Sequence, residues 1–464
     1  MREVPRLKSL LEARSVAVIG ASSDPLKIGG RPIDYLRRYG FSGRIVPVNP
    51  NRAEIQGLRC FRNLSETEPV DLAIISAPAS DAKEAVMQCI GAGTKNLILF
   101  TAGFAEVDNA GRAAQEFLAK AAADKGAQLL GPNCLGAINA HSRLVASFTT
   151  ALEESPLPPG AFSYMGQSGA LGAYWIEKTI SAGLGVSKWI TTGNEAQITL
   201  ADALAYLASD DETRVIGAYI EDVKQPEVFA QAAAAARAAG KTILAIKSGR
   251  SPAGQRAVAG HTGAVAGDDT RYQALLDDCG ITRVASLTEM VDTTRLVLSA
   301  VPPRQGKRLG IVTVSGGAGV LICDVAHDFG FTIAELPADV LARLDTLLPV
   351  FVQRQNPVDV TGAVVSNTPM LREVVSTLAG SDACDVIVLF FGAMNSIREG
   401  LVDAVREAKS HGKPVVVIWM AGNPEAIRMI ETMGIAVFNE IPPAIGALAR
   451  AIESAGSNGE PKHA

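Results

Sequence analysis

The stretch from Lys247 to Gly267, KSGRSPAGQRAVAGHTGAVAG, combines small residues and cations with a single histidine. Small residues let the backbone approach a ligand closely, and cations beside them favour an anion. His261 lies inside this stretch, and a neutral imidazole nitrogen can attack phosphorus and hold a phosphoryl group covalently. The pattern predicts either a loop that carries phosphate on His261 or a surface loop with an incidental histidine.

A carboxylate and two polar turns are predicted to lie near His261. Glu221 directly follows an apolar strand, Ser168 follows another, and Asn194 lies in a second polar turn. Because ligands of parallel sheets bind at the carboxyl ends of the strands, we expect these residues at one sheet edge. Glu221 is the candidate partner of His261, since a carboxylate that accepts a hydrogen bond from one ring nitrogen orients the imidazole. The alternative interpretation of Glu221 is a solvated acid on the surface. The strands predicted here are 162–165, 215–220 and 242–246.

The sequence GQSGALG at 166–172 is predicted to turn from a strand into a helix. Free N–H groups and the helix dipole make such a turn an anion site. The motif recurs 147 residues later, which indicates two duplicated flavodoxin-like domains. The second copy has no counterpart of His261, and its polar turn with Asn356 and Asp359 could hold a ligand or cap a turn. The four matched positions are Ser168/Ser315, Gly169/Gly316, Gly172/Gly319 and Gly183/Gly330.

The first 140 residues predict a doubly wound parallel sheet. Apolar strands alternate with helical patterns, which implies a sheet covered on both faces. Gly20-Ala21-Ser22-Ser23 could hold a phosphate at the following helix. It lacks the G-x-G-x-x-G spacing, and Asn49 stands where an acidic residue would bind a nicotinamide ribose. This favours a nucleotide-like ligand other than NAD, with a purely structural turn as the alternative. The predicted strands are 15–19, 44–48, 71–76, 96–100 and 128–130.

Composition excludes several classes of protein. The net charge is −5 and there is no basic tail, which argues against nucleic acid as a partner. The chain has no apolar run long enough for a membrane span and no signal-peptide core. The six cysteines and five histidines are scattered, so we expect reduced thiols in a cytoplasmic protein and no metal site.

Two Pro-rich linkers, 153–160 and 301–308, divide the chain. The predicted class is α/β, with a Rossmann-type domain followed by two flavodoxin-like domains. The later strands 309–314, 386–391 and 414–419 support the last of these. The predicted domain bounds are 1–140, 150–298 and 305–460.

Taken together, the motifs resemble one known family. The chain resembles the α subunit of NDP-forming acyl-CoA synthetases (acetate–CoA ligase, ADP-forming), in the succinyl-CoA synthetase superfamily. The resemblance spans nearly the whole chain and implies a CoA-binding Rossmann domain followed by two ligase-type domains. The motifs that carry it are VAVIGASSDPLKIGG, PVNPN, IISAPA, TAGF, GPNCLG, GQSGALG, GNEAQ, YIED, KSGRS, GHTGAVAG, TVSGGAGVL and NPVDVTG.

The resemblance implies a reaction in which CoA and phosphate exchange on an acyl group through an acyl phosphate. The phosphoryl group passes to His261, with Glu221 as its partner, and then to ADP. The phosphate-binding positions implied are Gln167, Ser168 and Gly169, with Asn194 at the same edge, and Ser315, Gly316 and Gly317. The CoA contacts implied are Gly20, Ala21, Ser22, Lys27, Asn49, Ser76, Ala77, Pro78, Thr101, Ala102 and Gly103.

The family's nucleotide site is an ATP-grasp domain, which this sequence lacks. We therefore expect a separate ATP-grasp β subunit that supplies ADP or ATP with Mg²⁺, in an α₂β₂ assembly. A non-catalytic CoA-binding regulatory protein, an NAD-dependent oxidoreductase and a CoA transferase with an acyl-glutamate intermediate are the alternatives. The sequence leaves open which carboxylic acid is used, ADP or GDP, and the direction of the reaction.

Overall fold

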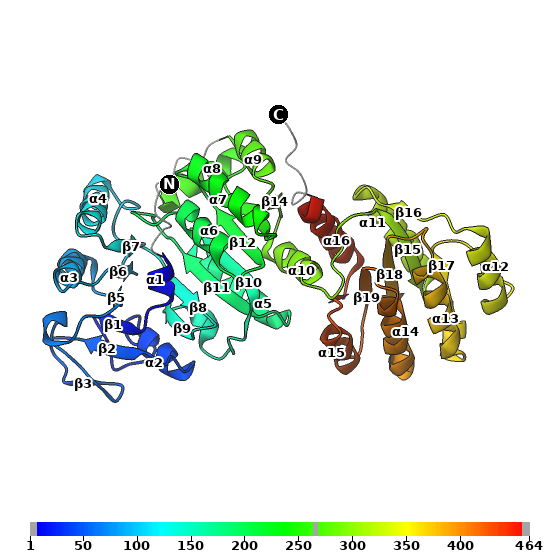
Figure 1. The fold of residues 1–464 in the computed structure, drawn as a ribbon, viewed down its shortest axis with the longest axis horizontal. Helices are drawn as coiled ribbons and strands as arrows, with labels where there is room; N and C mark the ends of the chain where they lie inside the picture. Colours follow the sequence, from blue (N-terminus) through cyan, green and yellow to red (C-terminus); the bar gives the residue numbers. More distant parts are fainter. Residues whose placement is uncertain (1–6, 263–267, 457–464) are drawn as a thin grey trace. The chain divides into compact units, whose positions relative to one another are not determined.

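The structure is a computed structural model that describes residues 7–262 and 268–456. The chain divides into two compact units, Met1–Leu287 and Thr288–Ala464 (Figure 1). Among the described residues, no helix has the length and apolar character needed to span a membrane.

The first unit begins with a parallel five-stranded sheet of order β2-β1-β5-β6-β7. In chain order this is 2-1-3-4-5, a doubly wound arrangement whose switch point lies between β1 and β5. The strands are β1 (Ser15–Ile19), β2 (Arg44–Val48), β5 (Leu72–Ile75), β6 (Asn96–Leu99) and β7 (Gln128–Leu130). The helices are α1 (Leu7–Leu11), α2 (Arg31–Arg38), α3 (Ala79–Gly91) and α4 (Asn109–Asp124), and β3 (Glu54–Ile55) pairs with β4 (Leu58–Arg59).

The two faces of this sheet belong to different cores. Ala17 of β1 faces a core that includes α3 and α4, while its neighbours Val16 and Val18 face the opposite side. Figure 1 shows α3 and α4 on one side of the sheet and α1 on the other. The second face shares a single core with the next sheet, to which Met165 and Ile190 contribute. The first two sheets are thus packed together through buried apolar side chains.

The second sheet has the order β14-β13-β12-β10-β11-β8-β9. Its first five strands are parallel, and β8 runs antiparallel to β11 and β9 to β8. The strands are β8 (Gly136–Asn139), β9 (Leu144–Ser147), β10 (Pro159–Gly166), β11 (Val186–Thr191), β12 (Val215–Ile220), β13 (Thr242–Lys247) and β14 (Thr282–Arg283). The helices are α5 (Gly169–Ser181), α6 (Leu200–Ser209), α7 (Pro226–Ala238), α8 (Pro252–Thr262) and α9 (Asp269–Asp278).

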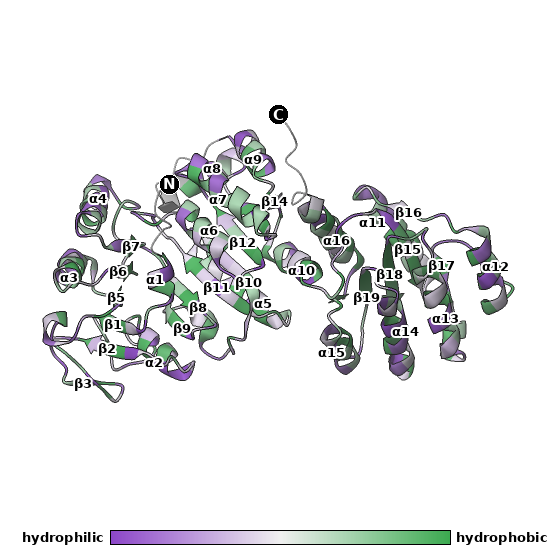
Figure 2. Cartoon of the chain, in the orientation of Figure 1, coloured by the Kyte–Doolittle hydropathy of each residue, from purple (hydrophilic) through white to green (hydrophobic). Residues whose placement is uncertain are grey.

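The second unit contains a third sheet of order β16-β15-β18-β19-β20, with β17 paired to β15. Figure 2 shows β18 and β19 as hydrophobic and much of α14 as hydrophilic, as expected for a sheet covered by amphipathic helices. The strands are β15 (Arg308–Thr313), β16 (Thr332–Ile333), β17 (Val358–Asp359), β18 (Val386–Phe391), β19 (Val415–Trp419) and β20 (Val437–Phe438). The helices are α10 (Leu287–Val297), α11 (Gly316–Asp328), α12 (Ala338–Leu347), α13 (Thr368–Ala379), α14 (Arg398–Ser410), α15 (Pro424–Thr432) and α16 (Ile441–Gly456).

The predicted α/β class and the predicted duplication are confirmed. In chain order, the main parallel strands of the second and third sheets also follow 2-1-3-4-5. Helices α5 and α11 have equal lengths and begin at the two matched glycines. In both, the preceding serine caps the helix: Ser168 Oγ accepts a hydrogen bond from Leu171 N at 3.4 Å, and Ser315 Oγ accepts one from Ala318 N at 3.4 Å.

Candidate functional site

The predicted polar residues meet at the carboxyl edge of the second sheet. The strands β13, β12, β10 and β11 are adjacent and parallel, and Glu221, Ser168 and Asn194 follow three of them. The fourth strand, β13, leads into α8, whose backbone includes His261. The side chain of His261 and residues 263–267 lie outside the described part of the structure.

Gln167 connects the ends of β10 and β12 through its side-chain amide. Its Oε1 accepts hydrogen bonds from the backbone N–H of Glu221 at 2.7 Å and of Asp222 at 3.1 Å. Its Nε2 donates to the carbonyl oxygen of Asp222 at 3.0 Å. Gln167 is buried, so these bonds are shielded from water. The amide therefore fixes the backbone that carries Glu221 relative to the start of α5.

A buried cation supports Glu221 from the other side. Glu221 is only 3% exposed, and Lys247 Nζ donates to its backbone carbonyl oxygen at 2.9 Å. The Lys247 ammonium lies 4.1 Å from the centre of the Tyr272 ring, and the Tyr272 hydroxyl donates to Asp222 Oδ1 at 2.6 Å. Burial lowers the pKa of Lys247, while burial and the bond to Asp222 raise the pKa of Tyr272. Local positive charge therefore lies beneath the Glu221 backbone.

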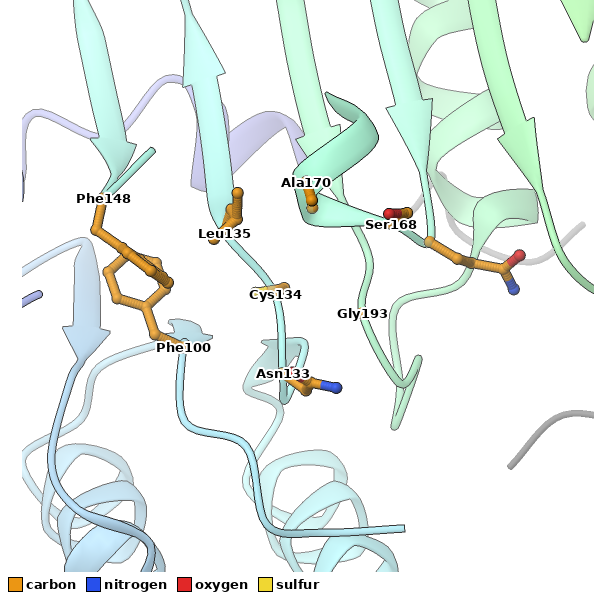
Figure 3. A pocket seen from close by; sticks show the side chains of 10 residues that line it. Phe100, Asn133, Cys134, Leu135, Phe148, Ser168, Ala170 and Gly193 are labelled. Atoms are coloured by element: carbon orange, nitrogen blue, oxygen red, sulfur yellow. The ribbon is translucent and has the colours of Figure 1, made fainter. Parts of the chain in front are cut away.

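A pocket of about 180 Å³ lies between the first and second sheets, at the N-terminus of α5. Figure 3 shows the rings of Phe100 and Phe148 next to each other at one end and Ser168 at the other. The two ring centres are 4.7 Å apart. An apolar end therefore faces a polar end that contains the first turn of a helix, where N–H groups have no partner within the helix. The lining residues are Phe100, Asn133, Cys134, Leu135, Phe148, Gln167, Ser168, Gly169, Ala170 and Gly193.

The side chain of Asn194 is hydrogen-bonded to other side chains of the protein. Its Nδ2 donates to Glu106 and to Gln115 Oε1, the latter at 3.0 Å, and its Oδ1 accepts from Asn133 Nδ2 at 3.2 Å. Lys224 Nζ donates to the Asn194 carbonyl oxygen at 2.7 Å. The residue thus fastens the end of β11 to α4 and to two loops that follow strands of the first sheet. Asn194 lies at the end of β11, and its side-chain amide is engaged by other protein groups.

Glu195, next to it, is a buried acid that sequence reasoning did not single out. It is 4% exposed, and its Oε1 accepts hydrogen bonds from Thr192 Oγ1 at 3.0 Å and from Leu200 N at 2.9 Å. Among the described residues, its Oε2 has no hydrogen-bond partner. Burial raises the pKa of Glu195 to about 7, and the charge of Lys224 offsets part of this rise. A carboxyl group that titrates near neutrality therefore lies beside the site.

The predicted CoA contacts gather at the carboxyl edge of the first sheet. Asn49 Nδ2 donates to the carbonyl oxygen of Ala21 at 2.9 Å, and Ser76 Oγ donates to the carbonyl oxygen of Ile19 at 2.8 Å. Thr101 Oγ1 donates to the Ala77 carbonyl oxygen at 2.7 Å. These side chains join the loops after neighbouring strands into one surface. Gly20, Ser22, Pro78, Ala102 and Gly103 lie in the same loops.

The loop between β1 and α2 is compact. Gly20 has a φ of +78°, and a Cβ at Gly29 would lie 2.2 Å from the Gly20 carbonyl oxygen, so the loop folds back on itself. The backbone of Lys27 takes part in this fold, since Gly30 N donates to its carbonyl oxygen at 2.8 Å. Two exposed apolar side chains here were missed from the sequence: Leu26 is 69% exposed and Ile28 is 49% exposed.

In the second unit, Ser315, Gly316 and Gly317 form the start of α11, as predicted. Asn356, which the sequence left open as a ligand or a cap, is bound into the sheet. Its Oδ1 accepts from Ile311 N at 2.9 Å, and its Nδ2 donates to the carbonyl oxygens of Leu309 at 2.7 Å and Ala334 at 3.0 Å. Asp359 Oδ1 accepts from Thr361 N at 2.8 Å, an Asx turn at the strand end.

Three parts of the chain match known families. Residues 14–140 match a CoA binding domain, residues 159–297 a succinyl-CoA ligase like flavodoxin domain, and residues 309–432 a ligase-CoA domain. Over 455 residues the chain is 33% identical to a protein named acetate–CoA ligase (ADP-forming) II subunit alpha from Pyrococcus furiosus, covering 96% of this chain and 97% of that one. The chain belongs to the ADP-forming acetate–CoA ligase α-subunit family.

A longer relative and a solved structure also match nearly the whole of this chain. The chain is 32% identical to acetate–CoA ligase (ADP-forming) I from Archaeoglobus fulgidus, and the match covers 95% of this chain and 63% of that protein. Among solved structures, acetyl-coenzyme A synthetase 1 from Candidatus Korarchaeum cryptofilum, in complex with phosphate and ADP, aligns with a TM-score of 0.87 at 30% identity. That alignment covers 99% of this chain and 98% of the other.

Proposed function

We propose that this chain is the CoA-binding, phosphoryl-carrying subunit of an ADP-forming acyl-CoA synthetase, with His261 as the phosphoryl acceptor. The observation that carries the proposal is the shared edge of β10, β12 and β13. It combines the start of α5, the buried Glu221 and the helix that contains His261. Such an edge supports phosphoryl transfer, which depends on positioned N–H groups and cations more than on covalent machinery.

The first step is exchange on the acyl group. A phosphate oxygen attacks the carbonyl carbon of the thioester, the C–S bond breaks, and CoA leaves with acyl phosphate formed. The first-turn N–H groups of α5 hold the phosphate oxygens, as helix N-termini do. CoA lies along the edge formed by the loops at Gly20, Asn49, Ser76 and Thr101. The pocket at the start of α5 is lined by Phe100, which directly precedes Thr101 of this edge.

The second step moves the phosphoryl group to the protein. An imidazole nitrogen of His261 attacks phosphorus, the P–O bond to the acyl group breaks, and the carboxylate leaves. Glu221 accepts a hydrogen bond from the other ring nitrogen and so stabilises the positive charge that develops on the ring. Gln167 and Lys247 act as positioning residues, because they bind the backbone of Glu221 on both sides.

The third step takes place with a partner. An oxygen of the terminal phosphate of ADP attacks the phosphohistidine, the P–N bond breaks, and ATP is released. The ADP site and its Mg²⁺ belong to a separate ATP-grasp β subunit, and two copies of each chain form an α₂β₂ assembly. The α-subunit name of the relative from Pyrococcus furiosus supports a split enzyme. The six free cysteines support a reducing compartment, the cytoplasm.

The proposal is tested first without the partner, because the first two steps need only this chain, and then with an ATP-grasp subunit. We incubate the chain with radiolabelled inorganic phosphate and an acyl-CoA, and look for protein-bound label that is lost in acid and kept in base. We expect such label to require the acyl-CoA and to vanish in His261→Ala. If the wild-type chain binds CoA but stays unlabelled, with acyl-CoA and phosphate or with γ-labelled ATP and an ATP-grasp subunit, the catalytic role is wrong. A CoA-binding regulatory protein would then be the better account.

A further inference from the structure

Glu195 holds its carboxyl group at the end of β11 on a strained backbone. Its φ is +55°, in the left-handed region that glycine adopts freely and that costs other residues conformational energy. Neighbouring contacts impose this conformation. Ala196 N donates to the Gly131 carbonyl oxygen at 3.0 Å, and Lys224 Nζ donates to the Glu195 carbonyl oxygen at 3.1 Å. Strain of this kind at a residue other than glycine points to a role for the side chain itself.

In the described part of the chain, the Glu195 carboxyl group is buried with one oxygen bonded and the other without a partner. Its Oε1 accepts hydrogen bonds from Thr192 Oγ1 at 3.0 Å and from Leu200 N at 2.9 Å, and the residue is 4% exposed. The oxygen without a partner is Oε2. Because Oε1 already faces two donors, the proton of the neutral acid belongs on Oε2.

The side-chain amide of Gln167 lies beside this carboxyl group. Burial raises the pKa of Glu195 to about 7, the Lys224 charge lowers it, and Gln167 lowers it further as a hydrogen-bond donor. The Gln167 Oε1 is committed to the backbone N–H groups of Glu221 and Asp222, so the donor is Nε2. That nitrogen carries two N–H groups and gives one to the Asp222 carbonyl oxygen at 3.0 Å. The second N–H is the one that can reach Glu195.

Charged groups around Glu195 come from several elements. The cation is Lys224, in the loop after β12, which acts on the Glu195 carboxyl group through its charge. The acids on the surrounding elements are Glu106 after β6, Asp202 in the first turn of α6, and Glu221 and Asp222 after β12. Because burial and the cation act in opposite directions, the carboxyl group changes its charge near neutral pH.

We propose that Glu195 is a positioning residue whose ionised carboxylate accepts the second N–H of Gln167 and so holds the amide that binds the backbone of Glu221. When the pH falls, the acid takes up a proton from solvent on Oε2. Two donors then face each other, and the hold on Gln167 weakens. Phosphorylation of His261 is therefore faster with Glu195 ionised. This inference rests on the proposed function, since it assigns a pH control to the same site.

The test measures the initial rate of acid-labile, base-stable labelling from about pH 5.5 to about pH 8.5, a range that spans the titration of Glu195. The probes are labelled phosphate with acetyl-CoA, isobutyryl-CoA or phenylacetyl-CoA, whichever labels fastest. In Glu195→Gln the side-chain oxygen stays with Thr192 and Leu200, and an N–H₂ group replaces Oε2. The variant therefore mimics the neutral acid at every pH.

We expect equal rates for wild type and Glu195→Gln at the acid end of the range. At the alkaline end, wild type should be faster by about tenfold, the scale of one hydrogen bond to a charged group. The ratio of the two rates should rise with a midpoint near the Glu195 pKa of about 7. Titration of His261 and of phosphate cancels in this ratio, because both proteins share those groups.

Thr192→Val supplies a second, independent measurement. The change keeps Glu195, Gln167 and Glu221 but removes a hydrogen bond that lowers the pKa of Glu195. The midpoint of the rate profile should therefore move to higher pH, with the wild-type rate regained above it. Glu116→Gln, at an exposed position of α4, is the control with an unchanged profile. Circular dichroism checks the fold, and Thr192→Val alone decides if Glu195→Gln does not fold.

The outcomes separate the two proposals. If Glu195→Gln is labelled as fast as wild type at every pH, or slower by one constant factor, the positioning role is wrong. An unchanged midpoint in Thr192→Val also overturns it. In these cases the label in wild type leaves the proposed function standing. If wild type takes up no label at any pH, the proposed function fails, and the role of Glu195 fails with it.

Discussion

The side-chain Oε1 of Gln167 lies 2.7 Å from the backbone nitrogen of Glu221. One residue precedes α5 by two positions, and the other directly follows β12. The hydrogen bond therefore sets the distance between the proposed phosphate-binding helix start and the proposed partner of His261. A single buried amide holds two parts of the site that are 54 residues apart in sequence.

Replacing Gln167 with leucine should affect both stability and phosphorylation. The change leaves the buried N–H group of Glu221 and the partly buried N–H group of Asp222 without their acceptor, at about 1–3 kcal/mol for each. We expect a lower free energy of unfolding in urea and slower histidine labelling, although His261 and Glu221 are intact. Gln88→Leu, at an exposed position of α3, should change the unfolding free energy by less than about 0.5 kcal/mol. Normal labelling in Gln167→Leu would contradict the positioning role.

The neutral variant Glu221→Gln should slow phosphorylation without loss of CoA binding. The amide keeps the shape of the carboxylate but not its charge, and such loss of an orienting group costs about 10- to 100-fold. The initial rate of label incorporation from an acyl-CoA and labelled phosphate measures this. Glu227→Gln, exposed in the first turn of α7, is the control with an unchanged rate. Equal rates for both variants would exclude Glu221 as the partner of the histidine.

Glu195 should make stability fall as the pH rises. Its pKa is raised from 4.5 to about 7, so between these values the folded chain keeps a proton that the unfolded chain has released. The free energy of unfolding therefore decreases across this window and stays lower above it, by about 3 kcal/mol at most. Glu195→Gln removes the decrease, so its advantage over wild type should be greatest above pH 7. Thermal melts from pH 4 to 8 measure this, with the exposed Glu116→Gln as control. If the melting temperatures of Glu195→Gln and wild type differ by the same amount at every pH, the raised pKa of Glu195 is contradicted.

Replacing Asn356 should lower the stability of the second unit and leave CoA binding unchanged. Asn356→Leu removes three partly buried hydrogen bonds that join the segment before β17 to β15 and to the residue after β16. We expect a loss of about 2–4 kcal/mol in the unfolding of this unit, and no change in CoA affinity. Asn395→Leu, at an exposed site, is the comparison. Reduced CoA affinity in Asn356→Leu with an unchanged melt would show that the residue acts on the site and not on the fold.

Strand positions could be predicted where the interior of a strand has no charged residue. The predicted strands 15–19, 44–48, 215–220 and 386–391 have the observed bounds. In contrast, β11 was missed because its sequence, VSKWIT, contains a lysine. Lys188 is 1% exposed and lies 3.2 Å from Asp210 Oδ2 and 2.5 Å from Glu212 Oε2. Because this buried ion pair requires a lysine inside the strand, β11 lacks the uninterrupted apolar pattern from which a buried strand is predicted.

The site was predictable to the level of strand ends but not of contacts. Parallel strands bring Ser168, Glu221 and the helix with His261 to one edge, which follows from sequence alone. The engagement of Asn194 with Glu106 and Gln115 depends on packing between the first two sheets. The β8–β9 pair, which extends the second sheet, was missed because it too depends on how the first two domains pack together. The strand β8 lies at the end of the first predicted domain, 1–140, and β9 lies between the predicted domains, yet both pair into the second sheet.

The core shared by the first two sheets has a consequence for the energetics of binding. Side chains from β1, β5, β10 and β11 lie in that one core, so the two sheets unfold as one cooperative unit. The free energy released when a ligand binds at the first sheet therefore stabilises the second sheet as well. Binding of CoA to the first sheet would therefore slow amide hydrogen exchange in β11 and α6 of the second sheet. The CoA-binding sheet and the proposed phosphate edge are then coupled through apolar packing, with no moving part between them.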